Sequence, residues 1–123
     1  MKQTVVDTFT ATIYVGLKER DTEILHSIDL VRNTCQKYCD EVGLCVTVTL
    51  TEYIYTDGQE AGAIIGLINY PRFPATPMKV RGDALYLAQT LMEACNQYRV
   101  TVVFPDQTIM LSDPRFIQCS GRD

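Results

Sequence analysis

Hydrophobic and polar residues alternate along several stretches of the chain, with the period of two that is typical of a strand with one buried face. Residues 8–17 show the pattern first, and residues 44–55 repeat it with an aliphatic face and a Thr/Tyr face. Residues 61–70 are apolar on both faces, which predicts a strand in the interior of a sheet. Asp57 and Gly58, between the second and third stretches, are a hairpin-turn signal.

A helix is predicted between the first two strands. Apolar residues recur there at intervals of three and four, from Ile28 to Val42. Ser27 is a residue type that caps helix starts, and Gly43 is the type that most often ends them. The pattern therefore predicts a helix over residues 28–42.

A second helix is predicted after a proline-rich loop. Thr76 and Pro77 suit the N-cap and the first helical position, and the apolar face that follows continues to Cys95. Gly82 weakens the first turns, since glycine inside a helix costs about 1 kcal/mol relative to alanine. The sequence leaves two possible starts open, Pro77 and a position near Asp83.

The order of these elements predicts the fold class. Two short strands at 100–104 and 108–111 complete the order strand, helix, strand, strand, helix, strand, strand, and residues 112–123 form a polar tail. This order predicts an α+β two-layer sandwich, close to the ferredoxin-like plan, with a mainly antiparallel sheet and both helices on one face. A chain of 123 residues is the size of one domain, with its core at about 8–111.

The second face of such a sheet is left without helices. The residues expected on it are threonines and tyrosines: Thr12, Tyr14, Thr47, Thr49, Tyr53 and Tyr55. Tyrosine is favoured at protein interfaces because it brings a large area and a polar tip with few rotatable bonds. We therefore expect this face to support a homo-oligomer, with open solvent as the alternative.

Composition excludes several classes of protein. The chain is 46% hydrophobic and 21% charged, which fits a folded soluble domain, and no run approaches the roughly 18 apolar residues of a membrane span. The N-terminus has no apolar signal region, so we expect a cytoplasmic protein. The five cysteines are odd in number and form no CxxC pair, which indicates neither a disulfide framework nor a zinc site.

The groups that most hydrolytic enzymes use are scarce. The chain has one histidine, His26, for which a capping or solvated role is favoured over catalysis. No serine lies in a nucleophile motif, and no glycine-rich phosphate loop is present. The acidic residues are scattered rather than clustered at ligand spacing. The sequence therefore predicts no catalytic residue, no metal and no cofactor.

Positive charge is concentrated in one loop. Residues 69–82 contain three basic residues and no acidic one, although the whole chain has a net charge of -4. The loop leads into a helix N-terminus, which favours anions, and its aromatic rings offer stacking surface for a base. The candidate ligand-binding residues are Asn69, Tyr70, Arg72, Phe73, Lys79 and Arg81. They predict a small nucleotide ligand, whereas the net negative charge disfavours long nucleic acid. The alternative is a rigid connector whose ring covers the core.

Two segments carry a resemblance to a known family. They are EVGLCVTVTLTEYIYTDGQEAGAIIGLINYPRFPATP and, after the second helix, YRVTVVFPDQTIML. The chain resembles, over about 8–111, the phage Thoeris anti-defence sponge proteins of the first family described. The resemblance implies a small oligomer, a dimer that can assemble into a hexamer, in the cytoplasm of the infected bacterial host. It implies that the protein captures cyclic nucleotide immune signals, a cyclic ADP-ribose isomer and in some members CBASS cyclic oligonucleotides, without cleaving them.

The resemblance also implies roles for single residues. Phe73 would stack on the adenine and Arg72 would contact phosphate, with Arg20 and Arg99 as weaker candidates and Asp83 on a ribose hydroxyl. The leading hypothesis is then a non-enzymatic sponge. Two alternatives stay open: a small cyclic-nucleotide-processing enzyme that uses a histidine or a carboxylate as its base, and a protein-interaction module.

Overall fold

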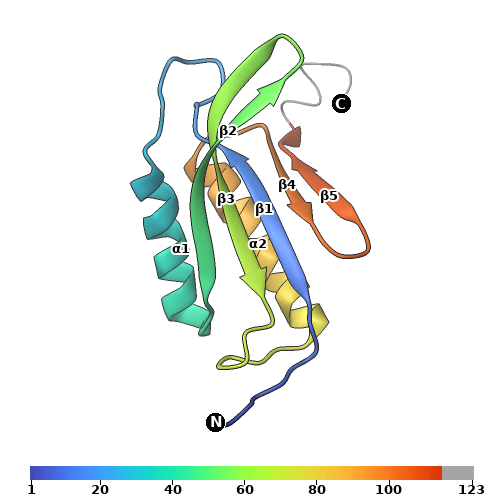
Figure 1. Cartoon of the computed structure of the whole chain (residues 1–123). Helices are drawn as coiled ribbons and strands as arrows, with labels where there is room; N and C mark the ends of the chain where they lie inside the picture. Colours follow the sequence, from blue (N-terminus) through green and yellow to red (C-terminus); the bar gives the residue numbers. More distant parts are fainter. Residues whose placement is uncertain (115–123) are drawn as a thin grey trace.

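The computed structural model describes residues 1–114 and shows the predicted order of elements (Figure 1). The residues at 115–123, in the predicted tail, lie outside the described residues. The elements are β1 (Thr10–Gly16), α1 (Ile28–Val42), β2 (Val46–Tyr55), β3 (Gly58–Ile68), α2 (Pro77–Ala94), β4 (Arg99–Val103) and β5 (Thr108–Ser112).

The five strands form one antiparallel sheet in the order β2-β3-β1-β4-β5. The first four follow the split arrangement of the ferredoxin-like plan, and β5 extends the sheet beside β4. Both helices cover one face, with α2 against β1 and β4 and α1 against α2 and β2. Figure 1 views the sheet from its other face, with α2 behind the strands and α1 beside β2. The predicted two-layer α+β architecture is confirmed.

The ends of α1 follow its sequence. Gly43 takes a left-handed φ of +70°, and its N–H donates to the carbonyl of Cys39 at 2.9 Å. Glycine adopts this conformation without the strain that a side chain would bring, so the helix stops there. Ser27 occupies the N-cap position with an extended backbone, but its side chain makes no capping hydrogen bond.

The sequence left two possible starts for α2, and the structure shows the earlier one. The helix begins at Pro77, and the Thr76 hydroxyl accepts a hydrogen bond from the Lys79 N–H at 3.1 Å. This cap offsets the cost of Gly82, which stays inside the helix. The later start near Asp83 is therefore wrong.

The two caps lead to a paired prediction. Thr76→Ala should lower the free energy of unfolding by about 1 kcal/mol, because an orphan helix N–H loses its acceptor. Ser27→Ala should cost less than Thr76→Ala, since no capping hydrogen bond is lost. Urea unfolding followed by circular dichroism measures both variants. Equal losses would show that Thr76 does not cap α2.

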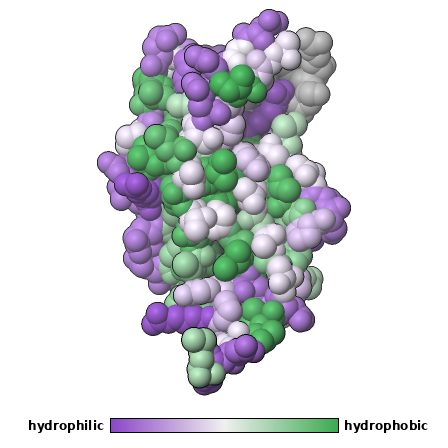
Figure 2. Space-filling view, viewed as in Figure 1, coloured by the Kyte–Doolittle hydropathy of each residue, from purple (hydrophilic) through white to green (hydrophobic). Residues whose placement is uncertain are grey.

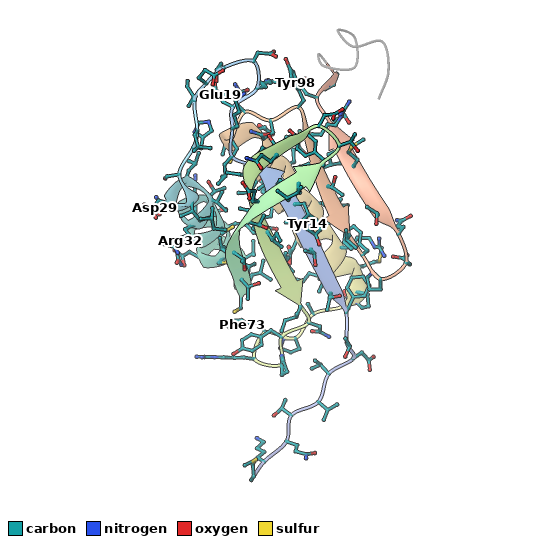
Figure 3. All side chains as sticks on the ribbon, turned by 45° about the horizontal axis from the view of Figure 1, so that its top comes forward. Tyr14, Glu19, Asp29, Arg32, Phe73 and Tyr98 are labelled. Carbon is teal, nitrogen blue, oxygen red and sulfur yellow. The ribbon has the colours of Figure 1, made fainter. Side chains whose placement is uncertain are left out.

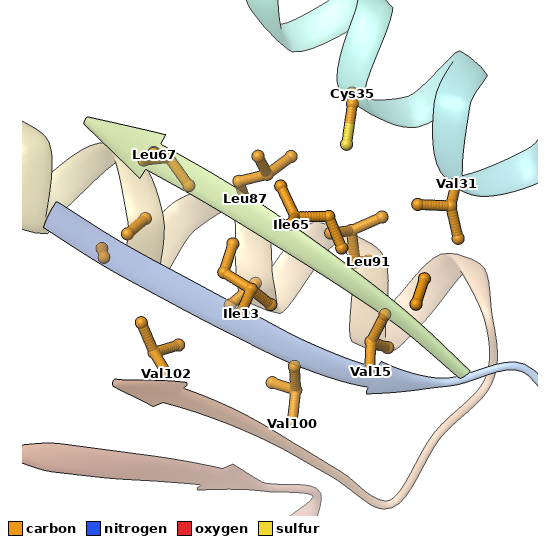
Figure 4. Close-up of a cluster of buried hydrophobic side chains, with 14 of the residues drawn as sticks. Ile13, Val15, Val31, Cys35, Ile65, Leu67, Leu87, Leu91, Val100 and Val102 are labelled. Atoms are coloured by element: carbon orange, nitrogen blue, oxygen red, sulfur yellow. The ribbon is translucent and has the colours of Figure 1, made fainter. Parts of the chain in front are cut away.

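The hydrophobic core lies between the sheet and the helices. Figure 4 shows aliphatic side chains of β1, β3 and β4 meeting those of α1 and α2. The largest fully buried side chains are Ile13, Leu17, Ile65, Leu67, Leu87, Leu91, Val15, Val31, Val80, Val100, Val102 and Cys95. Alternation therefore leaves the remaining positions of each strand on the open face.

The turn between β2 and β3 differs from its prediction by one residue. Thr56 and Asp57 form the two-residue loop, and Gly58 is already paired with Tyr55. Asp57 takes the left-handed conformation, with φ of 64°. Gly58 does not take a positive φ. It leaves room for the Tyr55 ring, because a Cβ at this position would lie 2.3 Å from a ring atom.

The open face of the sheet carries the threonines and tyrosines that the sequence predicts there. The register pairs Thr47 with Gly66, Thr49 with Ile64 and Tyr53 with Glu60, all on this face. Figure 2 shows apolar and weakly polar residues over the strands and strongly hydrophilic residues around the rim. In the described part of the chain, no helix is long and apolar enough to cross a membrane.

Candidate functional site

A hollow of about 490 Å³ lies at one end of the open face, where β1, β2, β3, β4 and β5 meet the loop that follows β1. This size is within the usual range of small-molecule sites. Figure 3 shows Tyr14 on the face of the sheet, and Glu19 and Tyr98 at this end of the molecule. Its lining includes Tyr14, Gly16, Lys18, Tyr53, Glu60, Gln97, Arg99 and Met110.

The ring of Tyr53 lies flat across the sheet. It crosses Gly62 of the neighbouring strand, where a Cβ would lie 2.0 Å from the ring carbon Cε2. The Tyr53 hydroxyl donates toward two carbonyls, that of Val15 at 3.0 Å and that of Ala63 at 2.9 Å. Glycine in β3 thus allows Tyr53 to form part of the floor of the hollow.

Tyr53 and Tyr14 form an aromatic pair. Their ring centroids are 6.5 Å apart and their planes are inclined by 57°. Burial raises the pKa of Tyr53 to about 12, and the nearby charge of Glu60 acts in the same direction. Tyr53 is therefore neutral at physiological pH and offers its ring rather than a phenolate base.

Glu60 is the carboxylate that faces the hollow without a partner. It lies opposite Tyr53 in the register, and its side chain is half-buried. Within residues 1–114 its carboxylate forms no hydrogen bond and no ion pair. A carboxylate in a hollow is incompletely solvated and therefore attracts a cationic ligand. The positive charge of the ligand replaces the interactions with water that the carboxylate has lost.

The other acidic residues at the rim already have partners. Glu19 lies 3.0 Å from the Nε2 atom of His26, and the Tyr98 hydroxyl donates to Asp21. Arg20 donates to Asn96 at 2.9 Å, and its guanidinium lies 4.7 Å from the centre of the Tyr98 ring. These contacts fix the loop after β1 as a wall of the hollow.

Gln97 completes the floor beside Gly16. Its amide nitrogen donates to the Lys18 carbonyl at 2.6 Å and to the Cys95 carbonyl at 3.0 Å. Its carbonyl oxygen is held over Gly16, where a Cβ would lie 2.6 Å away. Gly16 is paired with Gly62, so Gln97 and Tyr53 lie over two adjacent glycines of β1 and β3.

The predicted ligand-binding residues are spread over several places. Arg20 and Arg99 line the hollow on the open face, and Arg20 is held there by an ion pair with Asp113 at 2.5 Å. Tyr70, Arg72 and Phe73 lie together at another hollow, between α1 and the start of β2. Figure 3 places Phe73 at the end of the molecule opposite Tyr98. The structure thus divides the predicted site into two.

Two further candidates, Lys79 and Asp83, belong to a partly buried network between the helices. Asp83 is only 8% exposed, and its carboxylate accepts hydrogen bonds from the Tyr38 hydroxyl at 2.7 Å and from Lys79 Nζ at 2.8 Å. Tyr38 in turn stacks on Tyr86, with ring centroids 5.2 Å apart. Both carboxylate oxygens are thus engaged within the protein.

The last two candidates have structural contacts of their own. The side chain of Asn69 donates to the Asp7 carbonyl at 2.7 Å and accepts from the Ala75 N–H at 2.9 Å, which fixes the loop before α2. Arg81 pairs with Asp106 at 2.8 Å and lies 4.3 Å from the centre of the Phe104 ring. That the nine candidates bind a ligand stays a prediction.

Sequence reasoning missed Glu60 and Gln97. Glu60 was detectable, because it shares the parity of Gly62 in β3 and therefore lies on the face that carries Tyr53. Gln97 follows the end of α2, in an irregular segment whose path no pattern in the sequence indicates.

Comparisons with known proteins identify no family, since no protein-family model and no curated protein matches the sequence. Two solved structures match. A phage SAM lyase in the apo state has a TM-score of 0.67 and 18% identity, covering 86% of this chain and 90% of that one. A phage SAM lyase in complex with S-methyl-5'-thioadenosine has a TM-score of 0.69 and 18% identity, covering 92% and 95%. This chain shares their fold.

These neighbours correct the prediction of function. Along almost the whole chain the shared fold is that of an enzyme, so the expectation of a non-enzymatic sponge is wrong. The Thoeris, cyclic ADP-ribose and CBASS assignments, which the resemblance implied together with the sponge, are corrected by the same finding, because both neighbours are SAM lyases. The enzyme alternative agrees better with the neighbours.

Proposed function

We propose that this protein is an enzyme that cleaves a C–S bond of S-adenosylmethionine (SAM) and releases S-methyl-5'-thioadenosine. The observation that carries the proposal is the match over 92% of the chain to a phage SAM lyase in complex with that thioether. We assign the reaction to the hollow on the open face, for the reasons of charge and shape that follow.

The hollow suits a sulfonium compound. SAM carries two positive charges, on its sulfur and its amino group, and one carboxylate. Aromatic faces attract such cations, and the hollow supplies Tyr14 and Tyr53. Glu60 supplies the unpaired negative charge, while Lys18, which also lines the hollow, can receive the substrate's carboxylate.

The reaction needs little chemical equipment from the protein. Within SAM, the carboxylate oxygen can attack the γ-carbon of the methionine part, so that a C–O bond forms while the C–S bond breaks. The electron pair goes to sulfur, which leaves as a neutral thioether, and the four-carbon fragment closes to an amino lactone. No water, proton or cofactor enters the balance. A scarcity of histidine and serine therefore does not argue against catalysis of this kind.

The protein's contribution is then to bind and orient the substrate. We propose that Glu60 pairs with the substrate's ammonium group, which frees the substrate's carboxylate from its own amino group. Tyr53 and Tyr14 hold the sulfonium end against their rings. Such positioning is effective because it replaces a search among conformers with one reactive geometry.

Incubation of the purified protein with SAM tests this function. We expect S-methyl-5'-thioadenosine and a four-carbon product that is one water lighter than homoserine, both followed by liquid chromatography and mass spectrometry. Intact SAM after prolonged incubation would overturn the proposed function. Homoserine carrying solvent oxygen on its γ-carbon would instead show hydrolysis, and would overturn the proposed route.

We also propose that the protein self-associates and acts in the cytoplasm of a phage-infected host, where SAM is available. Several large apolar side chains lie exposed on the sheet, among them Tyr14, Tyr55, Ile68 and Met110. A second subunit against this face would add walls to the hollow. Light scattering at micromolar concentration tests this, and a monomer mass of 13.9 kDa would contradict it.

A further inference from the structure

A second hollow, which we call the α1–β2 groove, lies between α1 and the start of β2. Its walls come from α1, from the segment that leads into β2, and from the loop that precedes α2, and its volume is about 490 Å³. Its lining includes Arg32, Leu44, Tyr70, Arg72 and Phe73. Figure 3 shows Arg32 on α1 and Phe73 below it, away from Tyr14 and Tyr98.

The charge of the groove is entirely positive. Arg32 and Arg72 line it, and no acidic residue among residues 1–114 does, although the chain carries a net charge of -4. Arg72 forms no ion pair within the described residues. Arg32 lies 3.6 Å from Asp29, but both side chains of this pair are more than half exposed. Exposed pairs of this kind contribute little, so Arg32 can also turn to an anion in the groove.

An aromatic surface stands beside the two guanidinium groups. Phe73 is 41% exposed, and the Tyr70 ring meets it edge-on at 5.9 Å, which fixes its orientation. The Arg72 guanidinium lies 5.8 Å from the centre of the Phe73 ring. The loop is held in place by the Phe73 N–H, which donates to the Tyr70 carbonyl at 2.9 Å. The groove is thus formed before any ligand binds.

From this arrangement we propose that the α1–β2 groove is a second binding site, for a small anion that carries a planar ring, of the chemistry of a nucleoside monophosphate. The ring packs against Phe73 over the apolar floor that includes Leu44, and the phosphate lies between Arg32 and Arg72. SAM is a cation overall, so the positive charge of the groove excludes it. The two hollows therefore bind ligands of opposite charge.

Calorimetric titration with AMP tests the second site. Adenosine, which has the ring without the phosphate, and inorganic phosphate, which lacks the ring, are titrated for comparison. We expect AMP to bind more tightly than either. Arg72→Gln and Phe73→Ala should each weaken AMP binding about tenfold or more. Lys37→Gln, which removes a positive charge from an exposed position of α1 outside the groove, should leave AMP binding unchanged.

Three results would overturn the second site. They are no AMP binding to the wild-type protein, an equal loss in Lys37→Gln and Arg72→Gln, and phosphate binding as tight as AMP binding. Circular dichroism shows whether each variant is folded, and the milder Phe73→Leu serves if Phe73→Ala unfolds. Arg72 and Phe73 line the α1–β2 groove and not the hollow on the open face, so a loss of AMP binding in their variants is independent of the proposed cleavage reaction.

Discussion

Glu60→Gln should lower kcat/KM for SAM cleavage by about ten- to a hundredfold, which is the size expected for losing one charge-assisted hydrogen bond to the substrate. The substitution keeps the size of the side chain and removes its charge. The substrate's ammonium then stays paired with the substrate's own carboxylate, and productive conformers become rarer. Steady-state release of S-methyl-5'-thioadenosine measures the effect.

Glu52→Gln is the matched control. Glu52 lies on β2, one residue before Tyr53 and therefore on the other face of the sheet, and it is exposed. Its loss removes the same charge from the protein without touching the hollow, so kcat/KM should stay close to the wild-type value. Equal rates for Glu60→Gln and the wild type, or equal losses in both variants, would remove Glu60 from the site.

Gly62→Ala should impair both folding and activity, because the added methyl group would lie 2.0 Å from the Tyr53 ring. The ring must swing away, and its hydroxyl then leaves the carbonyls of Val15 and Ala63. Overpacking of this kind costs about 1–3 kcal/mol of folding free energy. We expect kcat/KM to fall about tenfold as well, because the sulfonium loses one aromatic face, worth about 1 kcal/mol or more.

Gly82→Ala is the control for this substitution. Nothing lies within 4 Å of a Cβ at this helical position, so alanine should be tolerated or should stabilise α2 by up to about 1 kcal/mol. Urea unfolding and the cleavage assay compare the two variants. If Gly62→Ala unfolds the protein, Tyr53→Phe keeps the ring and removes only the hydroxyl contacts. Wild-type behaviour of Gly62→Ala would show that the ring does not need this position.

The sequence predicted the fold well where local signals and packing agree. Gly43 ends α1 with its left-handed backbone, and Thr76 caps α2 as its position before a proline indicates. The period of two placed the tyrosines of β1 and β2 on the open face, as the register confirms. The prediction was less exact at the turn between β2 and β3, where Asp57 rather than Gly58 takes the positive φ.

The site was harder to predict because it depends on contacts distant in sequence. Basic residues close together in the chain point in different directions: Lys79 turns to Asp83, Arg81 to Asp106, and Arg72 to the α1–β2 groove. The hollow on the open face combines residues from all five strands and two loops. No single stretch of sequence contains enough of it to form a motif.

The prediction of a non-enzymatic sponge rested on the family resemblance. The scarcity of histidines, serines and metal ligands agreed with it, because we took that scarcity to indicate an absence of catalysis. That inference holds for hydrolysis of stable bonds, in which the protein must supply an acid, a base or a nucleophile. It fails for a sulfonium, whose leaving group is a neutral thioether and whose nucleophile is already part of the substrate.

We propose that the open face of the sheet is the site that binds the adenosyl thioether. Backbone amide shifts in ¹⁵N-labelled protein titrated with S-methyl-5'-thioadenosine test it most directly. The account predicts saturable shifts around Tyr14, Tyr53 and Glu60, and none around Phe73. Shifts confined to the α1–β2 groove, or no shifts at any concentration, would contradict it.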